Sequence, residues 1–164
     1  MLEYQRRGAK WENVKSVSTQ ILQTDFIETV LNYTLTAINA LNIPEFVDWV
    51  VNNKINGVGI TPVFREDYMS VDALPPDLLL PLVDQLKHKL LSYKSDNDEW
   101  TRTTAVKLVE TFLQILSNAT YRPEYVRKLR YKTLAEDRAS AKPFLEVVPQ
   151  WKPYFDAVKP SWVK

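Results

Sequence analysis

Residues 31–49 read LNYTLTAINALNIPEFVDW, and within this stretch the spacing of apolar side chains changes from two residues to about 3.6. Small polar residues first alternate with apolar ones, which places Asn32, Thr34 and Thr36 on one face of a strand. The alternation stops at Asn39, and Pro44 falls in the expected first turn of a helix. The stretch therefore predicts a strand, a loop and a helix. A strand with one polar and one apolar face fits a parallel barrel that has helices outside and a ligand inside.

The flanking segments extend this unit. Apolar residues at helical spacing predict a helix before the strand, and glycines bound a second short strand after the second helix. The predicted ranges are 9–22 (helix), 29–37 (strand), 44–53 (helix) and 57–63 (strand). Two strands joined through one short helix are expected to be parallel, with a right-handed crossover.

The rest of the chain is predicted to be helical. A polar loop over residues 64–76 leads to helices at 76–93, 97–117 and 123–133 and to a shorter element at 135–148. We therefore divide the chain into an α/β segment, residues 1–75, and a helical region, residues 76–164. Since two parallel strands alone do not form a stable sheet, we expect the α/β segment to belong to a larger fold or to pair with a partner.

Composition excludes several kinds of chemistry. The chain has no cysteine, so it offers no thiolate nucleophile and no cysteine ligands for zinc or an iron–sulfur cluster. The single histidine, His88, lies between two lysines in a predicted helix, which favours a solvated surface position over a catalytic one. The sequence therefore predicts no catalytic residue and no metal site of its own.

The charge balance points to no particular class of partner. The formal net charge is +1, so no overall field attracts the chain to nucleic acid or to a membrane surface. No apolar run approaches the ~18 residues of a membrane span, and the N-terminal residues lack the apolar core of a signal peptide. We expect a cytoplasmic protein.

Two charged clusters have simple structural explanations. The run from Asp96 to Glu99 lacks the glycine of a calcium loop and is expected to cap the following helix. The second cluster is basic and interleaved with tyrosines, and a solvated helix face is favoured there over contact with RNA or phosphate. Its basic members are Arg122, Arg127, Lys128, Arg130 and Lys132.

Three stretches together resemble a known family. They are YTLTAINALNIPEFVDWV at 33–50, FREDYMSVDALPPDL at 64–78 and KTLAEDRASAKPFLEVVPQW at 132–151. Their order and spacing are similar to those in the C-terminal half of radical S-adenosylmethionine proteins of the twitch-domain type. The second stretch carries the Tyr-x-Ser-x-x-x-Leu-Pro signature as Tyr68 to Pro75, and the third resembles the closing Leu-Asp/Glu-x-x-Arg…Pro segment. The resemblance covers roughly residues 2–155.

The resemblance implies an α/β fold, the C-terminal half of a partial (β/α) barrel with two parallel strands followed by an α-helical tail. It also implies S-adenosylmethionine and a [4Fe–4S] cluster as cofactors of the complete protein. In that family the cluster is held by a Cys-x3-Cys-x2-Cys loop, and no residue of this chain can replace those thiolates. We therefore expect this chain alone to bind no cluster, and we expect an N-terminal half or an upstream partner chain to supply it. A split gene, a truncation and an incomplete gene model all remain open.

The resemblance also implies site residues. Those matching the family's cofactor-binding positions are Asn32, Thr34, Thr36, Asn39 and Thr61, and those in the substrate-facing loop are Arg65, Tyr68 and Ser70. Hydroxyls and amides suit ribose and carboxylate oxygens because they form hydrogen bonds without adding charge. The competing interpretation is a solvated strand face with an asparagine cap, followed by a loop that contacts water.

Two classes of function follow. In the first, the chain contributes cofactor- and substrate-facing barrel strands to a radical S-adenosylmethionine enzyme and is not catalytic alone. In the second, it is a non-catalytic interaction or binding module derived from a half-barrel. The substrate stays unidentified, with a peptide as one open class.

Overall fold

The computed structural model describes residues 11–22, 24, 30–65, 67–138 and 143–158. The secondary structure alternates at first and is helical afterwards, as the sequence predicts. The elements are α2 (Trp11–Leu22), β1 (Val30–Leu35), α3 (Ile43–Asn52), β2 (Gly57–Pro62), α4 (Pro76–Lys94), α5 (Val106–Ser117), α6 (Pro123–Asp137), α7 (Phe144–Val147) and α8 (Lys152–Ala157).

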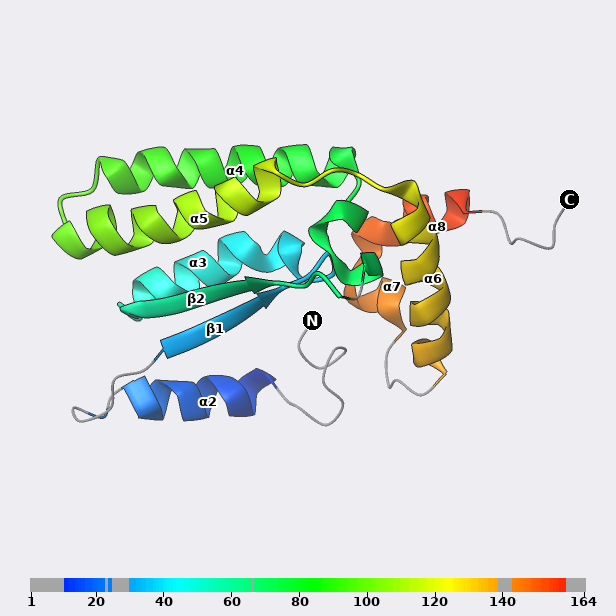
Figure 1. Cartoon of the computed structure of the whole chain (residues 1–164). Coiled ribbons are helices and arrows are strands. Elements are labelled where there is room, and N and C mark those ends of the chain that lie inside the picture. Colours follow the sequence, from blue (N-terminus) through cyan, green and yellow to red (C-terminus); the bar gives the residue numbers. More distant parts are fainter. Residues whose placement is uncertain (1–10, 23, 25–29, 66, 139–142, 159–164) are drawn as a thin grey trace, which may run out of the picture.

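The two strands form a parallel pair, as predicted for two strands joined through one short helix, here α3. Their register runs from Val30 opposite Gly57 to Leu35 opposite Pro62. In Figure 1, α3, α4 and α5 lie to one side of the strands and α2 lies to the other. Within the described residues the sheet contains only these two strands, so the mixed α/β class is established at that level.

Prolines set the start of three helices. Pro44, Pro76 and Pro123 each occupy one of the first two positions of their helix. There the missing N–H costs no intrahelical hydrogen bond and the fixed φ favours helix formation. The predicted element at 135–148 differs from the structure. Its first residues continue α6, and the side chain of Asp137 then accepts a hydrogen bond from the Phe144 N–H at the start of α7.

One hydrophobic core joins the α/β segment to the helical region. Phe112 of α5 is fully buried, and its ring centroid lies 5.4 Å from that of Tyr33 in β1 and 6.3 Å from that of Phe46 in α3. The same core continues into α6 and the C-terminal elements through Leu129, Phe144 and Trp151. The described parts of the two segments therefore pack around shared side chains.

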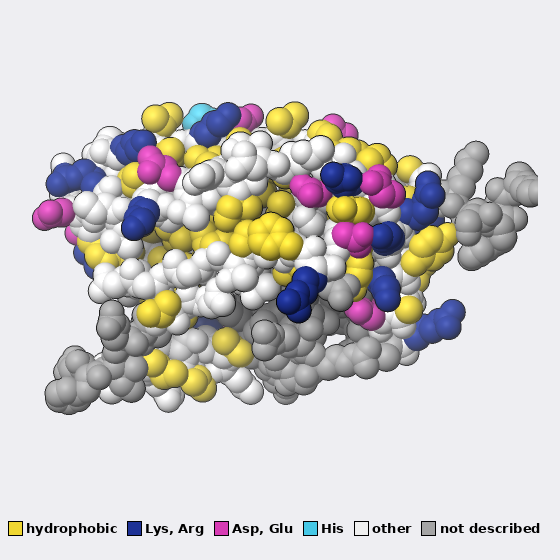
Figure 2. Space-filling model, viewed as in Figure 1, with side chains coloured by type: hydrophobic (Ala, Val, Ile, Leu, Met, Phe, Trp, Pro, Cys, Tyr) yellow, Lys and Arg dark blue, Asp and Glu magenta, His cyan; other side chains and the backbone are white. Residues whose placement is uncertain are grey.

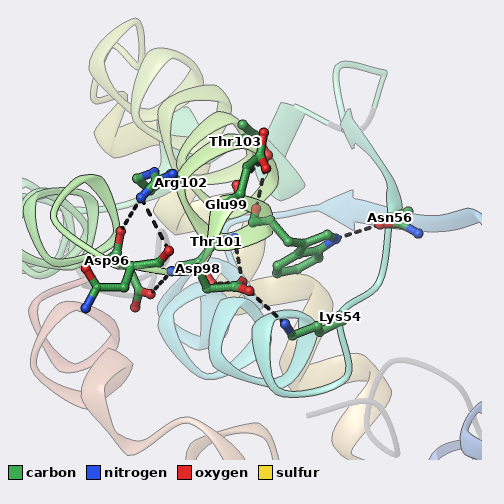
Figure 3. A network of polar contacts seen from close by, with 10 residues as sticks. Lys54, Asn56, Asp96, Asp98, Glu99, Thr101, Arg102 and Thr103 are labelled. Atoms are coloured by element: carbon green, nitrogen blue, oxygen red, sulfur yellow. Dashed lines mark hydrogen bonds and ion pairs between the residues drawn. The ribbon is translucent and has the colours of Figure 1, made fainter.

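A polar network ties the amino-terminal end of β2 to residues 96–103, which precede α5 (Figure 3). Lys54 Nζ lies 2.9 Å from Asp98 Oδ1, and Trp100 Nε1 donates to Asn56 Oδ1 at 2.6 Å. Lys54 has a φ of 48°, a left-handed conformation in the turn between α3 and β2. The network fixes the position at which β2 begins.

Asp98 also organises the helix that follows. Its Oδ2 accepts hydrogen bonds from the Thr101 N–H at 3.0 Å and from the Thr101 hydroxyl at 2.8 Å. The predicted capping role of the acidic run is therefore confirmed. The predicted continuous helix is interrupted by a π-helical turn, Thr101–Ala105, before α5 begins. Such turns accommodate one additional residue within an otherwise regular helix.

We expect Asp98→Asn to make the free energy of unfolding less dependent on pH in the acidic range. Hydrogen bonds from Lys54 and Thr101 lower the pKa of Asp98 to about 2. A lowered pKa stabilises the folded state above the unfolded-state value of about 3.9, and this stabilisation is lost as the pH falls toward the folded value. The difference in urea midpoint between wild type and variant should therefore shrink between about pH 4 and 2. Lys54→Gln should reduce the acid dependence in the same direction, and a difference that is constant over this range contradicts the assignment.

Candidate functional site

The outer face of the sheet is polar and exposed, as the alternation in the sequence predicts for Asn32 and Thr34. Thr34 lies opposite Thr61 in the register, and the side chains of Asn32, Thr34 and Thr61 are all exposed. The Thr61 hydroxyl donates a hydrogen bond of 3.0 Å to Asn32 Oδ1. This bond orients the amide of Asn32. The three neutral side chains therefore offer hydrogen-bonding groups on one surface.

Residue 59 leaves this surface open between the polar groups. Gly59 lies opposite Asn32, and a Cβ added there would be 3.7 Å from Asn32 Oδ1. That distance is an ordinary van der Waals contact, so the glycine is not required by crowding. The strand therefore carries no side chain beside the asparagine at this position.

Thr36 does not extend the strand face, which corrects the predicted set of three residues. β1 ends at Leu35, and Thr36 is buried with 4% of its surface exposed. Its N–H donates to Asn39 Oδ1 at 2.9 Å, and its hydroxyl accepts from the Asn39 N–H at 3.2 Å. The chain turns here because the asparagine replaces the hydrogen bonds that a further strand residue would make.

Asn39 itself closes the carboxyl end of β1. Its Nδ2 donates to the Thr34 carbonyl at 2.9 Å, and its own carbonyl accepts from the Tyr33 hydroxyl at 2.9 Å. Burial raises the pKa of Tyr33 above its usual value, so this hydroxyl stays a donor. The observed bonds give Asn39 a structural role in the turn, and its predicted contact with the cofactor stays a prediction.

The loop after β2 contains the three predicted substrate-facing residues, and they occupy different environments. Ser70 is buried and caps the 3₁₀ turn Val71–Ala73, accepting a hydrogen bond from the Asp72 N–H at 3.3 Å. Arg65 is exposed, and Tyr68 is half-buried. Tyr68 contacts the neighbouring helix α6, where Lys132 Nζ lies 5.9 Å from the centroid of its ring.

Basic residues of α6 that are predicted to lie on a solvated face also contact this loop. Lys128 Nζ lies 2.5 Å from Asp67 Oδ2, which lowers the pKa of Asp67 below its usual value. A contact between residues so far apart in the chain leaves no local pattern in the sequence. The only sequence signal is the position of Asp67 directly before Tyr68, the first residue of the Tyr-x-Ser-x-x-x-Leu-Pro pattern.

The turn after β1 and the loop after β2 meet at one end of the sheet. The Ala37 N–H donates to the Met69 carbonyl at 2.7 Å, and the Val63 N–H donates to the Leu35 carbonyl at 3.0 Å. Ligands of parallel α/β sheets commonly bind at the carboxyl ends of the strands. The polar strand face and this edge together form the candidate site.

Two kinds of site are absent from the described part of the chain. In that part, His, Cys, Asp and Glu side chains form no group of three or more that could hold a metal ion. None of its helices is both long enough and apolar enough to span a membrane. His88 is exposed on α4, which confirms its predicted surface position. No family model matches the chain, and no curated protein or solved structure matches it either.

Proposed function

We propose that this chain supplies cofactor- and substrate-facing strands to a radical S-adenosylmethionine enzyme. The proposal also assigns the remaining barrel strands and the cluster loop to polypeptide outside residues 1–164. The observation that carries it is the exposed polar face formed by Asn32, Thr34 and Thr61 on a parallel pair whose opposite face packs on helices. Such a face suits the interior of a barrel that encloses a ligand.

The donor set of this face fits part of S-adenosylmethionine. The hydroxyls of Thr34 and Thr61 and the amide of Asn32 can bond ribose hydroxyls and the carboxylate of the amino-acid portion. The cofactor supplies the radical chemistry when bound, and the residues of this chain bind and orient it. The donor set does not fit the [4Fe–4S] cluster, because the chain has no cysteine.

Unpaired surface around the sheet also supports the proposal. In the described residues each strand has one partner, which leaves one edge of each strand without a strand neighbour. Val30 at the start of β1 is 67% exposed, and Val17 on the apolar stripe of α2 is 54% exposed. Additional strands and helices would cover such surface, and covering apolar area is favourable by about 25 cal/mol per Å².

The direct test is to co-express the chain with the cluster-bearing half of a radical S-adenosylmethionine protein and titrate the purified complex with S-adenosylmethionine by calorimetry. Thr34→Val and Thr61→Val should each weaken binding about two- to tenfold, since a neutral hydrogen bond contributes about 0.5–1.5 kcal/mol. Thr111→Val on α5 is the matched control, because its hydroxyl bonds the Lys107 carbonyl away from the sheet face.

Three outcomes contradict the proposal. If the chain and the cluster-bearing half do not associate, the barrel arrangement is wrong. If they associate but Thr34→Val and Thr61→Val bind the cofactor as tightly as Thr111→Val, the polar face is not a cofactor site. Association without any cofactor binding favours the non-catalytic interaction module.

A further inference from the structure

Helix α6 follows the loop after β2 along its length. At its start, the Arg122 N–H donates to the Asp72 carbonyl at 2.8 Å. Further along the helix, Lys128 pairs with Asp67, and Lys132 lies over the ring of Tyr68. The helix therefore presents successive cations beside residues 67–72.

This helix lies at the carboxyl end of the two strands. Figure 1 shows α6 at the end toward which both strands point. The loop residue Met69 hydrogen-bonds to Ala37 directly after β1, so Tyr68 and the Lys132 above it lie close to the carboxyl end of that strand. The cations of α6 thus border the same edge as the candidate site.

Three cations lie on the exposed side of α6. Residues 122–132 contain five basic residues and one acidic residue, Glu124. Arg127, Lys128 and Lys132 are exposed, whereas Arg130 turns toward the C-terminal region and donates to the Val158 carbonyl. Figure 2 shows dark blue side chains, with magenta ones among them, gathered on the side of the molecule where α6 lies. Three exposed cations within residues 127–132 of one helix suit a ligand that carries several negative charges.

The tyrosines argue for a peptide ligand over a nucleic acid. Binding of single-stranded nucleic acid relies on bases stacking on aromatic faces. Here Arg122 Cζ and Lys128 Nζ each lie 5.7 Å from the ring centroid of Tyr125, and Lys132 covers Tyr68. Since cations already contact the rings of Tyr125 and Tyr68, these two rings are not open stacking platforms.

We propose that the α6 face formed by Arg127, Lys128 and Lys132 binds an acidic peptide segment and holds it at the carboxyl edge of the sheet. Identifying this peptide as the substrate rests on the proposed function, whereas binding itself requires only this chain. Asp67 competes for the same cation, because its carboxylate pairs with Lys128. The ligand's carboxylates replace this internal partner.

The test is a fluorescence-anisotropy titration of the full chain with a short glutamate-rich peptide at low salt. Lys132→Gln should weaken binding about two- to fivefold, and Asp67→Asn should strengthen it by about the same factor, as expected for exposed ion pairs. Lys132→Arg should retain the wild-type affinity because it keeps the charge. Lys107→Gln on α5 is the control, since it removes an equal charge from an exposed position on another helix.

Several results overturn this inference. They are equal binding of the glutamate peptide and its glutamine counterpart, equal effects of Lys132→Gln and Lys107→Gln, and weaker binding by Asp67→Asn. Tighter binding of a single-stranded RNA than of the peptide would identify nucleic acid, and not a peptide, as the ligand of this face. Because these titrations use the chain without the cluster-bearing half, their failure is distinguishable from failure of the cofactor titration.

Discussion

Phe112→Ala is expected to lower the free energy of unfolding by about 3–5 kcal/mol. The side chain is fully buried, and its ring packs edge-on against Tyr33 of β1 and Phe46 of α3. Truncation removes this apolar contact and leaves a cavity between the sheet and the α5 helix, and both effects are destabilising. Urea unfolding followed by circular dichroism and by tryptophan fluorescence measures the change.

The matched control is Phe64→Ala. Phe64 is 79% exposed, so the same substitution there should change stability by no more than about 0.5 kcal/mol. If Phe112→Ala costs no more than Phe64→Ala, the described packing of α5 on the sheet is wrong. Coincident transitions by the two probes are expected for wild type, because the α/β segment and the helical region share one core.

Asn39→Ala should be the second most damaging substitution, with an expected loss of about 2–4 kcal/mol. The variant leaves the Thr36 N–H and the Thr34 carbonyl without the amide that bonds them. Thr36 is buried, so water does not readily replace the lost partner at its N–H, and an unsatisfied buried group costs about 1–3 kcal/mol. Thermal and urea unfolding of the purified variant test this expectation.

Two further variants separate the contributions to the Asn39 turn. Asn39→Asp keeps an acceptor for the Thr36 N–H but loses the donor to the Thr34 carbonyl, so an intermediate loss is expected. Asn52→Ala removes an exposed amide at the end of α3 and should be nearly neutral. A loss for Asn39→Ala as small as that of Asn52→Ala would show that the turn does not depend on this side chain.

Local sequence patterns were sufficient for the elements and for part of the site. The period-two alternation correctly placed Asn32 and Thr34 on one strand face, and the short link through α3 correctly implied a parallel pair. Prolines marked the helix starts, and the acidic run marked the cap at Asp98. All of these depend on interactions within a few residues or on steric limits of the backbone, so they are visible in the sequence.

The same patterns do not show where a side chain bonds to a nearby backbone group in place of regular pairing. Thr36 continued the alternation, yet the amide of Asn39 bonds its N–H and ends the strand one residue earlier. At Ser70 the hydroxyl caps the following turn, and the predicted contact of this residue with substrate stays a prediction. In both cases a side chain competes with regular backbone hydrogen bonding, and alternation alone does not record that competition.

By itself, therefore, the sequence determined an α/β class with two parallel strands, one polar strand face, and the lack of cysteine ligands for a cluster. Only the tertiary structure decided that Phe112 unites the two segments in one core and that Lys128 and Lys132 meet Asp67 and Tyr68 at the carboxyl edge of the sheet. The physical reason is that these contacts join residues far apart in the chain. Their geometry follows from how whole helices pack on the sheet, and packing depends on the shapes of many side chains at once.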